Sequence, residues 1–310
     1  MTLPTTTTLE TDPRDVIVAA DDGTQLFTRR RAGPSEVVSV LCDGIACDGF
    51  IWKYLWEQLA LRTSVTHWNY RGHGRSQVPR DPERLGVEQH AADLAAVRAS
   101  LGDPEVILFG HSMGCQVVLE SMRKHAVHVR GIVLICGAPG RVTHTFKGSD
   151  ALAQLLPRLI ELVTRHPYLT RALWGGVPPE LALKMAFALG EVDSKRMSPE
   201  DLLPYLEHMV DMDPLMFLKM LRLAGDHSAL DLLPNLEVPA LVIASDRDSF
   251  TPPRLAEEMA KAIPKGELLM LEGTHAVPLE QRDAVEKRIN EFLDLVLAPM
   301  TEAPPAVTLA

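Results

Sequence analysis

The stretch from Glu105 to Cys115 constrains the fold more than any other part of the chain. Its first half, Val106 to Phe109, is an apolar run with the character of a buried strand. It leads directly into Gly110-His-Ser112-Met-Gly114, and a segment compatible with a helix, Gln116 to His125, follows. Small residues two before and two after the serine let the backbone turn sharply. The turn therefore predicts an exposed Ser112 hydroxyl beside the first amides of a helix, which is a nucleophile next to half of an anion site.

Strands and helices alternate along the first 140 residues. A hairpin around Asp21-Asp22-Gly23 is expected to open the fold, because this turn separates two short runs of strand character. The remaining strands are predicted at 36–42, 64–69, 106–109 and 131–136, and the helices after Gly49, at 87–101 and at 116–125. Such alternation is typical of an α/β fold with a mostly parallel central sheet flanked by helices.

The alternation stops between about residues 149 and 230, where only helical patterns are found. These patterns cover 152–164, 179–189 and 199–223, and six prolines interrupt the region. Strands are predicted again at 238–244 and 267–271, with helices at 253–263 and 279–297. The predicted division is a core at 14–140 and 231–297, a helical cap at 141–230 after the sixth strand, and loose tails at 1–13 and 298–310.

Functional groups in open α/β sheets collect beyond the carboxyl ends of the strands. Ser245-Asp246-Arg247-Asp248 follows one predicted strand, and Gly273-Thr274-His275 follows the last one. Ser112, an aspartate and His275 are therefore expected at the same edge of the sheet. In acyl transfer, His275 would take the Ser112 proton and return it to the leaving group, and Asp248 would orient the imidazole.

The same chemistry needs donors for an oxyanion. Backbone N–H groups of Ile45 and Met113 are the candidates, and Gly44 would let the backbone approach closely. No metal and no cofactor is required by this set of residues.

The chain resembles an α/β-hydrolase with a helical cap, over about residues 14–297. The resemblance rests on Gly110-His-Ser-Met-Gly114, Arg71-Gly-His-Gly-Arg-Ser76, the segment Val238 to Asp248, and Gly273-Thr-His275. It implies the α/β-hydrolase fold and the order nucleophile, acid, base. The family's acid ends a Gly-x-x-Asp-like turn, which Ser245 to Asp248 matches with Ser in place of Gly, so Asp248 is favoured over Asp246.

One position departs from the family pattern. Relatives carry His-Gly after the third strand, whereas this chain has Asp43-Gly44. An acidic side chain near an oxyanion site would oppose developing negative charge unless it points away or is hydrogen-bonded. Among the other histidines, His111 is usual for the family and is interpreted as a packing residue, and His73 as a residue that braces its loop.

The cap is rich in methionine and aromatic residues. Their helical spacing favours packing within the cap itself. The alternative is a flexible apolar wall over the active site, because methionine adapts to ligands of varied shape. The residues predicted to line a substrate pocket in that case are Trp174, Met185, Met209 and Met216.

The formal net charge of −10 argues against nucleic-acid binding, which needs a basic face. The four cysteines, including Cys42 and Cys47, form no metal-ligand spacing and favour buried free thiols in a reducing compartment. The N-terminus lacks the pattern of a signal peptide, and no apolar run is long enough to span a membrane. These features predict a cytoplasmic protein.

The predicted function is hydrolysis of a carboxylic ester of a small hydrophobic substrate through an acyl-enzyme on Ser112. The same fold leaves C–C bond hydrolases, lactonases, acyltransferases and cofactor-free haloperoxidases open. A nucleophilic aspartate is excluded, because the position holds Ser112. From another class, a ligand-binding or receptor protein that turns over slowly also remains open.

Overall fold

The computed structural model of the protein describes residues 12–298, so the predicted tails lie almost wholly outside the described part. An eight-stranded sheet has the order β1-β2-β4-β3-β5-β6-β7-β8. The pairs β1–β2 and β2–β4 are antiparallel, and all other neighbouring strands are parallel. The strands are β1 (Arg14–Ala19), β2 (Gln25–Arg31), β3 (Val38–Cys42), β4 (Ser64–Trp68), β5 (Val106–His111), β6 (Val129–Ile135), β7 (Ala240–Ser245) and β8 (Gly266–Leu271).

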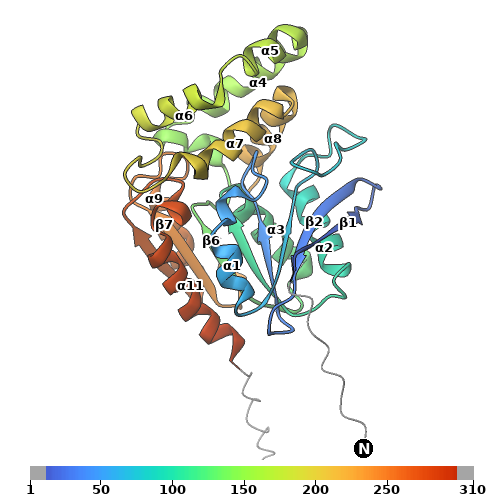
Figure 1. Cartoon of the computed structure of the whole chain (residues 1–310), viewed down its shortest axis with the longest axis vertical. Helices are drawn as coiled ribbons and strands as arrows, with labels where there is room; N and C mark the ends of the chain where they lie inside the picture. Colours follow the sequence, from blue (N-terminus) through green and yellow to red (C-terminus); the bar gives the residue numbers. More distant parts are fainter. Residues whose placement is uncertain (1–11, 299–310) are drawn as a thin grey trace, which may run out of the picture.

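Helices cover both faces of this sheet (Figure 1). Along β5, Val106 and Leu108 belong to one apolar cluster, whereas Ile107 and Phe109 belong to another. The first cluster packs against α2 (Val87–Ala99), α3 (Met113–His125) and α9 (Pro253–Ala262). The second packs against α1 (Leu55–Ala60) and α11 (Arg282–Leu297). Burial on both faces explains why the central strands read as continuous apolar runs.

The cap is inserted between β6 and β7 and is entirely helical. Its helices are α4 (Ala151–Arg165), α5 (Pro167–Trp174), α6 (Pro179–Ala188), α7 (Pro199–Asp211) and α8 (Pro214–Asp226). The chain segments that enter and leave the cap pair with each other at Gly140 and Ser228. The insertion follows the sixth strand, as predicted, and Figure 1 shows the cap as a separate layer above the sheet.

Several predicted helix limits are wrong. The predicted helix at 199–223 is two helices, because Met212 is extended and the Asp213 side chain caps α8 by accepting from the Met216 N–H at 2.8 Å. Helix α5, which begins at Pro167, was not predicted. The predicted last helix is divided into α10 (Val277–Glu280) and α11.

Within the part of the chain described here, no helix is long and apolar enough to cross a bilayer.

Candidate active site

Ser112 lies in a strained turn between β5 and α3. Its φ of 55° and ψ of −120° are unusual for a residue with a side chain. A Cβ at position 110 would lie 2.5 Å from the Gly114 carbonyl oxygen, and a Cβ at 114 would lie 2.2 Å from that of Cys42. Glycine is therefore required on both sides of the serine, and α3 begins directly at Met113 rather than at the predicted Gln116.

His275 and Asp248 form a hydrogen-bonded pair at the carboxyl ends of the last two strands. His275 Nδ1 lies 2.8 Å from Asp248 Oδ2. The imidazole and Ser112 both face one cavity, although no hydrogen bond joins Ser112 Oγ to His275 within the described chain. Catalytic hydrogen bonds of this kind are often long before substrate binds. The structure thus brings the three predicted residues to one site.

The Asp248 carboxylate is buried and fully engaged. Oδ1 accepts the N–H groups of Phe250 and Thr251, each at 2.9 Å, and Oδ2 accepts the Thr251 hydroxyl at 2.7 Å. Burial by itself raises the pKa of Asp248, but the charge of His275 and these hydrogen bonds outweigh it and lower the pKa. Asp248 therefore stays ionised and fixes His275 with Nδ1 bonded to the carboxylate.

The alternative acid, Asp246, faces elsewhere. Its Oδ1 accepts the Gly273 N–H at 3.0 Å, and its side chain is half exposed. Asp246 orients the loop before His275 and does not contact the imidazole.

The loop at 43–47 passes directly beside the nucleophile. A Cβ at Gly44 would lie 3.1 Å from Ser112 Cβ, so glycine permits this approach. Neither the Ile45 N–H nor the Met113 N–H donates to a protein acceptor among the described residues. Two amides near the serine are therefore free to donate to a ligand, and their role as oxyanion donors stays a prediction.

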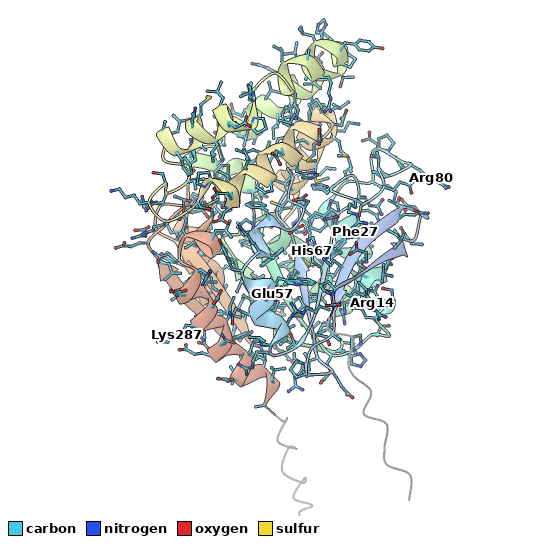
Figure 2. The ribbon with its side chains drawn as sticks, in the orientation of Figure 1. Arg14, Phe27, Glu57, His67, Arg80 and Lys287 are labelled. Atoms are coloured by element: carbon cyan, nitrogen blue, oxygen red, sulfur yellow. The ribbon has the colours of Figure 1, made fainter. Side chains whose placement is uncertain are left out.

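Asp43 points away from these amides. Its Oδ1 accepts the Trp52 indole N–H at 2.7 Å, and its Oδ2 lies 2.8 Å from His67 Nε2. His67 lies inside the molecule beneath the cap (Figure 2). The backbone carbonyl of Asp43 in turn accepts the Tyr70 hydroxyl at 2.8 Å. The acidic residue thus anchors the loop instead of opposing charge at the oxyanion site.

Two further histidines contact the backbone of the loops that carry Ile45 and His275. His73 Nε2 accepts the Ala46 N–H at 3.0 Å, and burial lowers the pKa of His73 to about 4. His111 Nε2 lies 3.1 Å from the His275 carbonyl oxygen, and burial together with the charge of His275 lowers the pKa of His111 to about 3. Both imidazoles are therefore neutral near pH 7, and neither bonds to Ser112.

A cavity of about 410 Å³ opens above the serine and is mostly apolar. The core contributes Ile45, Phe50 and Phe250 to its wall. The cap contributes side chains from four helices: Leu152, Ala186, Leu202, Tyr205, Leu206, Phe217, Leu221 and Ala224. A carboxylate also reaches this wall at Glu191, where Ser249 Oγ donates to it at 2.6 Å and Lys147 forms an ion pair with it.

The predicted pocket residues lie elsewhere, and that prediction is wrong. None of Trp174, Met185, Met209 and Met216 lines the cavity. The Trp174 indole donates to the Met209 carbonyl oxygen at 2.7 Å, Met216 packs against Gly72, and Met185 faces solvent. Packing within the cap, favoured by their helical spacing, accounts for Trp174 and Met209, whereas Met216 packs across to the core loop at Gly72.

The residues that line the cavity could not be predicted from the sequence, because the cap helices carry apolar residues on more than one side. Met185 and Ala186 are neighbours on α6, yet Met185 faces solvent and Ala186 faces the cavity. A helical pattern identifies an apolar stripe but not which of two stripes turns toward the core.

Cys136 lies close to the catalytic pair. Its Sγ, a carboxylate oxygen of Asp248 and a ring nitrogen of His275 lie within 4.8 Å of one another. Burial raises the pKa of Cys136 well above its ordinary value, so the thiol stays protonated and is a poor metal ligand. The carboxylate and the imidazole already bond to each other, and we assign no metal to this group.

The arrangement matches a known family. The sequence profile of the alpha/beta hydrolase family matches residues 40–288, which span the nucleophile, the cap and the acid–base pair. The chain belongs to the alpha/beta hydrolase family. Within this family, its solved relatives include an esterase from Thermogutta terrifontis with malate bound, which is 25% identical, covers 91% of this chain and 99% of that chain, and has a TM-score of 0.70.

Two curated proteins of similar sequence are informative. Polyketide synthase ThaQ of Burkholderia thailandensis is 30% identical over 263 residues, which is 83% of this chain but only 12% of the synthase. The pimeloyl-(acyl-carrier protein) methyl ester esterase of Vibrio vulnificus is 23% identical over 241 residues, covering 76% of this chain and 86% of the esterase. The chain therefore spans a small part of the first relative and most of the second.

Proposed function

We propose that this alpha/beta hydrolase is a serine carboxylesterase acting on small hydrophobic esters. One observation carries the proposal: Ser112 and the His275–Asp248 pair open into one apolar cavity, beside two amides that donate to no acceptor among residues 12–298. The esterase names of the Thermogutta and Vibrio relatives support it. Four buried free cysteines support a reducing compartment, and we place the activity in the cytoplasm.

The reaction follows from the geometry in two halves. Ser112 Oγ attacks the ester carbonyl carbon while His275 Nε2 takes the hydroxyl proton, and the Ile45 and Met113 amides bind the oxygen that becomes negative. The C–O bond to the alcohol then breaks, and His275 gives its proton to the departing oxygen. In the second half, His275 takes a proton from a water as its oxygen attacks the acyl carbon, and then returns the proton to Ser112 Oγ as the Oγ–acyl bond breaks and the acid leaves. Asp248 stabilises the charged imidazole in both halves.

The test is steady-state turnover of p-nitrophenyl esters of increasing chain length. We expect sustained release of p-nitrophenol with medium acyl chains, and loss of at least about 10³-fold in kcat/KM in Ser112→Ala. A single burst without sustained release would instead favour the slow ligand-binding protein. Turnover of a lactone or of a C–C bond substrate, but not of these esters, would move the reaction to another member of the fold.

A further inference from the structure

The cap exposes an unusual share of the molecule's large apolar side chains. Of the 17 such side chains exposed in the described chain, nine lie between residues 155 and 189, on or between helices α4, α5 and α6. Helix α5 buries no residue at all, and its Tyr168, Leu169 and Leu173 are 92%, 60% and 68% exposed. Apolar side chains gathered in this way mark an interaction surface rather than ordinary scattered exposure.

The exposed residues follow the period of a helix, so they form stripes. On α4, Leu155, Arg158, Leu162 and Arg165 recur at spacings of three or four residues and are all exposed. On α6, Leu181, Met185 and Leu189 recur every four residues, from within the helix to its end, and are also exposed. Figure 1 shows α5 at the tip of the cap, on the side away from the sheet. We call Leu155, Leu162, Tyr168, Leu169, Leu173 and Leu181 the outer cap face.

The charge of this region is opposite to that of the molecule. Residues 151–189 contain four basic side chains and two acidic ones, whereas the whole chain carries a formal net charge of −10. The basic side chains are Arg158, Arg165, Arg171 and Lys184. Arg158 and Lys184 form no ion pair within the described chain. Exposed apolar side chains combined with a net positive charge are typical of helices that lie on anionic lipid.

We propose that the outer cap face docks on an anionic lipid surface. Tyr168, Leu169 and Leu173 would enter the boundary between headgroups and acyl chains, and Arg158 and Lys184 would meet lipid phosphates. Repulsion between the acidic remainder of the chain and the lipid would orient the molecule with its cap toward the surface.

A second copy of the chain is the competing occupant of this face. A symmetric pair joined through it would bring together two copies of a region with net positive charge, because each copy presents the same patch. Like charges of this kind oppose the contact, whereas anionic lipid neutralises them. The charge of the face therefore favours lipid.

Docking would bear on substrate access. Helices α4 and α6, which carry the exposed stripes, also contribute Leu152 and Ala186 to the cavity wall. The same helices thus face lipid on one side and the substrate cavity on the other, which suits an amphiphilic substrate drawn from the lipid.

The test is co-sedimentation of the full chain with vesicles of phosphatidylcholine alone or mixed with phosphatidylglycerol. We expect binding to the mixed vesicles that weakens as salt is added. The double variant Leu169→Asp/Leu173→Asp should lose at least about tenfold in affinity, since two apolar side chains leave the interface and two negative charges enter it. Ser112→Ala should bind like the parent, so the result does not depend on the proposed esterase activity.

The matched control is Leu61→Asp/Val127→Asp. It adds the same charges outside the cap, at two side chains that are 67% and 69% exposed. It should bind the mixed vesicles nearly as well as the parent. No binding to mixed vesicles, or equal loss in both double variants, would overturn the proposal. A concentration-dependent dimer in sedimentation without lipid, broken only by the α5 variant, would assign the face to a second copy instead.

Discussion

Ser112 owes its exposure to a backbone conformation that its neighbours make possible, and its partners follow from where each strand ends. His275 lies after β8, and Asp248 lies after β7 at the same edge of the sheet. Each could be predicted because a short local motif and the end of a strand identify it. The environment of Asp43 could not be predicted from the sequence, because Trp52 and His67 approach it from separate elements.

The choice of catalytic acid gives a direct prediction. Asp248→Asn should lower kcat/KM by about 10³–10⁴-fold, because an amide cannot stabilise the charged His275 and favours the wrong tautomer. Asp246→Asn is the matched control and should stay within about threefold of the parent, since Asp246 bonds only to the Gly273 N–H and to exposed Arg247. Steady-state ester hydrolysis measures both, and a larger loss in the Asp246 variant would reverse the assignment.

Asp43 should matter for the loop rather than for the charge of the site. Asp43→Ala leaves the buried Trp52 and His67 nitrogens without their partner and should cost about 1–3 kcal/mol of unfolding free energy for each. Asp43→Asn keeps an acceptor for Trp52 and a polar group for His67, so its loss should be smaller. Urea unfolding measures both variants. If Asp43→Asn raised ester turnover severalfold, the carboxylate would be acting on the oxyanion after all.

Among the elements, the loop that carries Ile45 is held by a neighbouring loop. The Ala46 N–H donates to His73, which must be neutral to accept it. Its place in the sequence suggested only that His73 braces its own loop. Its bond to the oxyanion loop required tertiary structure, since 27 residues separate the two groups.

This bond makes stability depend on pH. Because the folded pKa of His73 is about 4 and the unfolded value about 6.5, the unfolded chain binds more protons between these values. Stability should therefore fall as pH drops through this window, by up to about 1.4 kcal/mol per pH unit from His73.

His73→Gln keeps an acceptor that does not titrate. Its unfolding free energy, measured in urea at several pH values between 7 and 4, should fall less steeply with decreasing pH than that of the parent. The difference in slope should correspond to at most about one proton taken up on unfolding. Burial, the largest cause of the lowered pKa of both His90 and His111, remains in both proteins, so the difference reports chiefly on His73. Equal slopes in the two proteins would contradict this role.

The cavity above Ser112 lies between the α/β core and the cap, and both contribute to its wall. Core residues such as Phe50 and Phe250 form its floor, and the cap helices form its roof. The sequence predicted both layers and their order, but not the choice of apolar stripe that turns inward. That choice depends on how α4 and α8 pack on each other and over the core, which no local pattern contains.

The roof should set the acyl chain length. Ala186→Phe adds a ring to the cavity wall and should lower kcat/KM for a p-nitrophenyl octanoate about tenfold or more, while the acetate changes little. Ala188→Phe, on the exposed side of the same helix, is the control and should preserve the ratio of the two substrates. A uniform loss on both esters in Ala186→Phe would indicate a disturbed cap rather than a filled cavity.

Covalent trapping of the nucleophile tests most directly whether Ser112 carries the reaction. The protein is treated with a serine-directed fluorophosphonate, and the adduct is mapped by peptide mass spectrometry. We expect one adduct, on Ser112, with complete loss of ester hydrolysis, and no adduct in Ser112→Ala. Labelling at another residue, or ester hydrolysis that persists in Ser112→Ala, would contradict it.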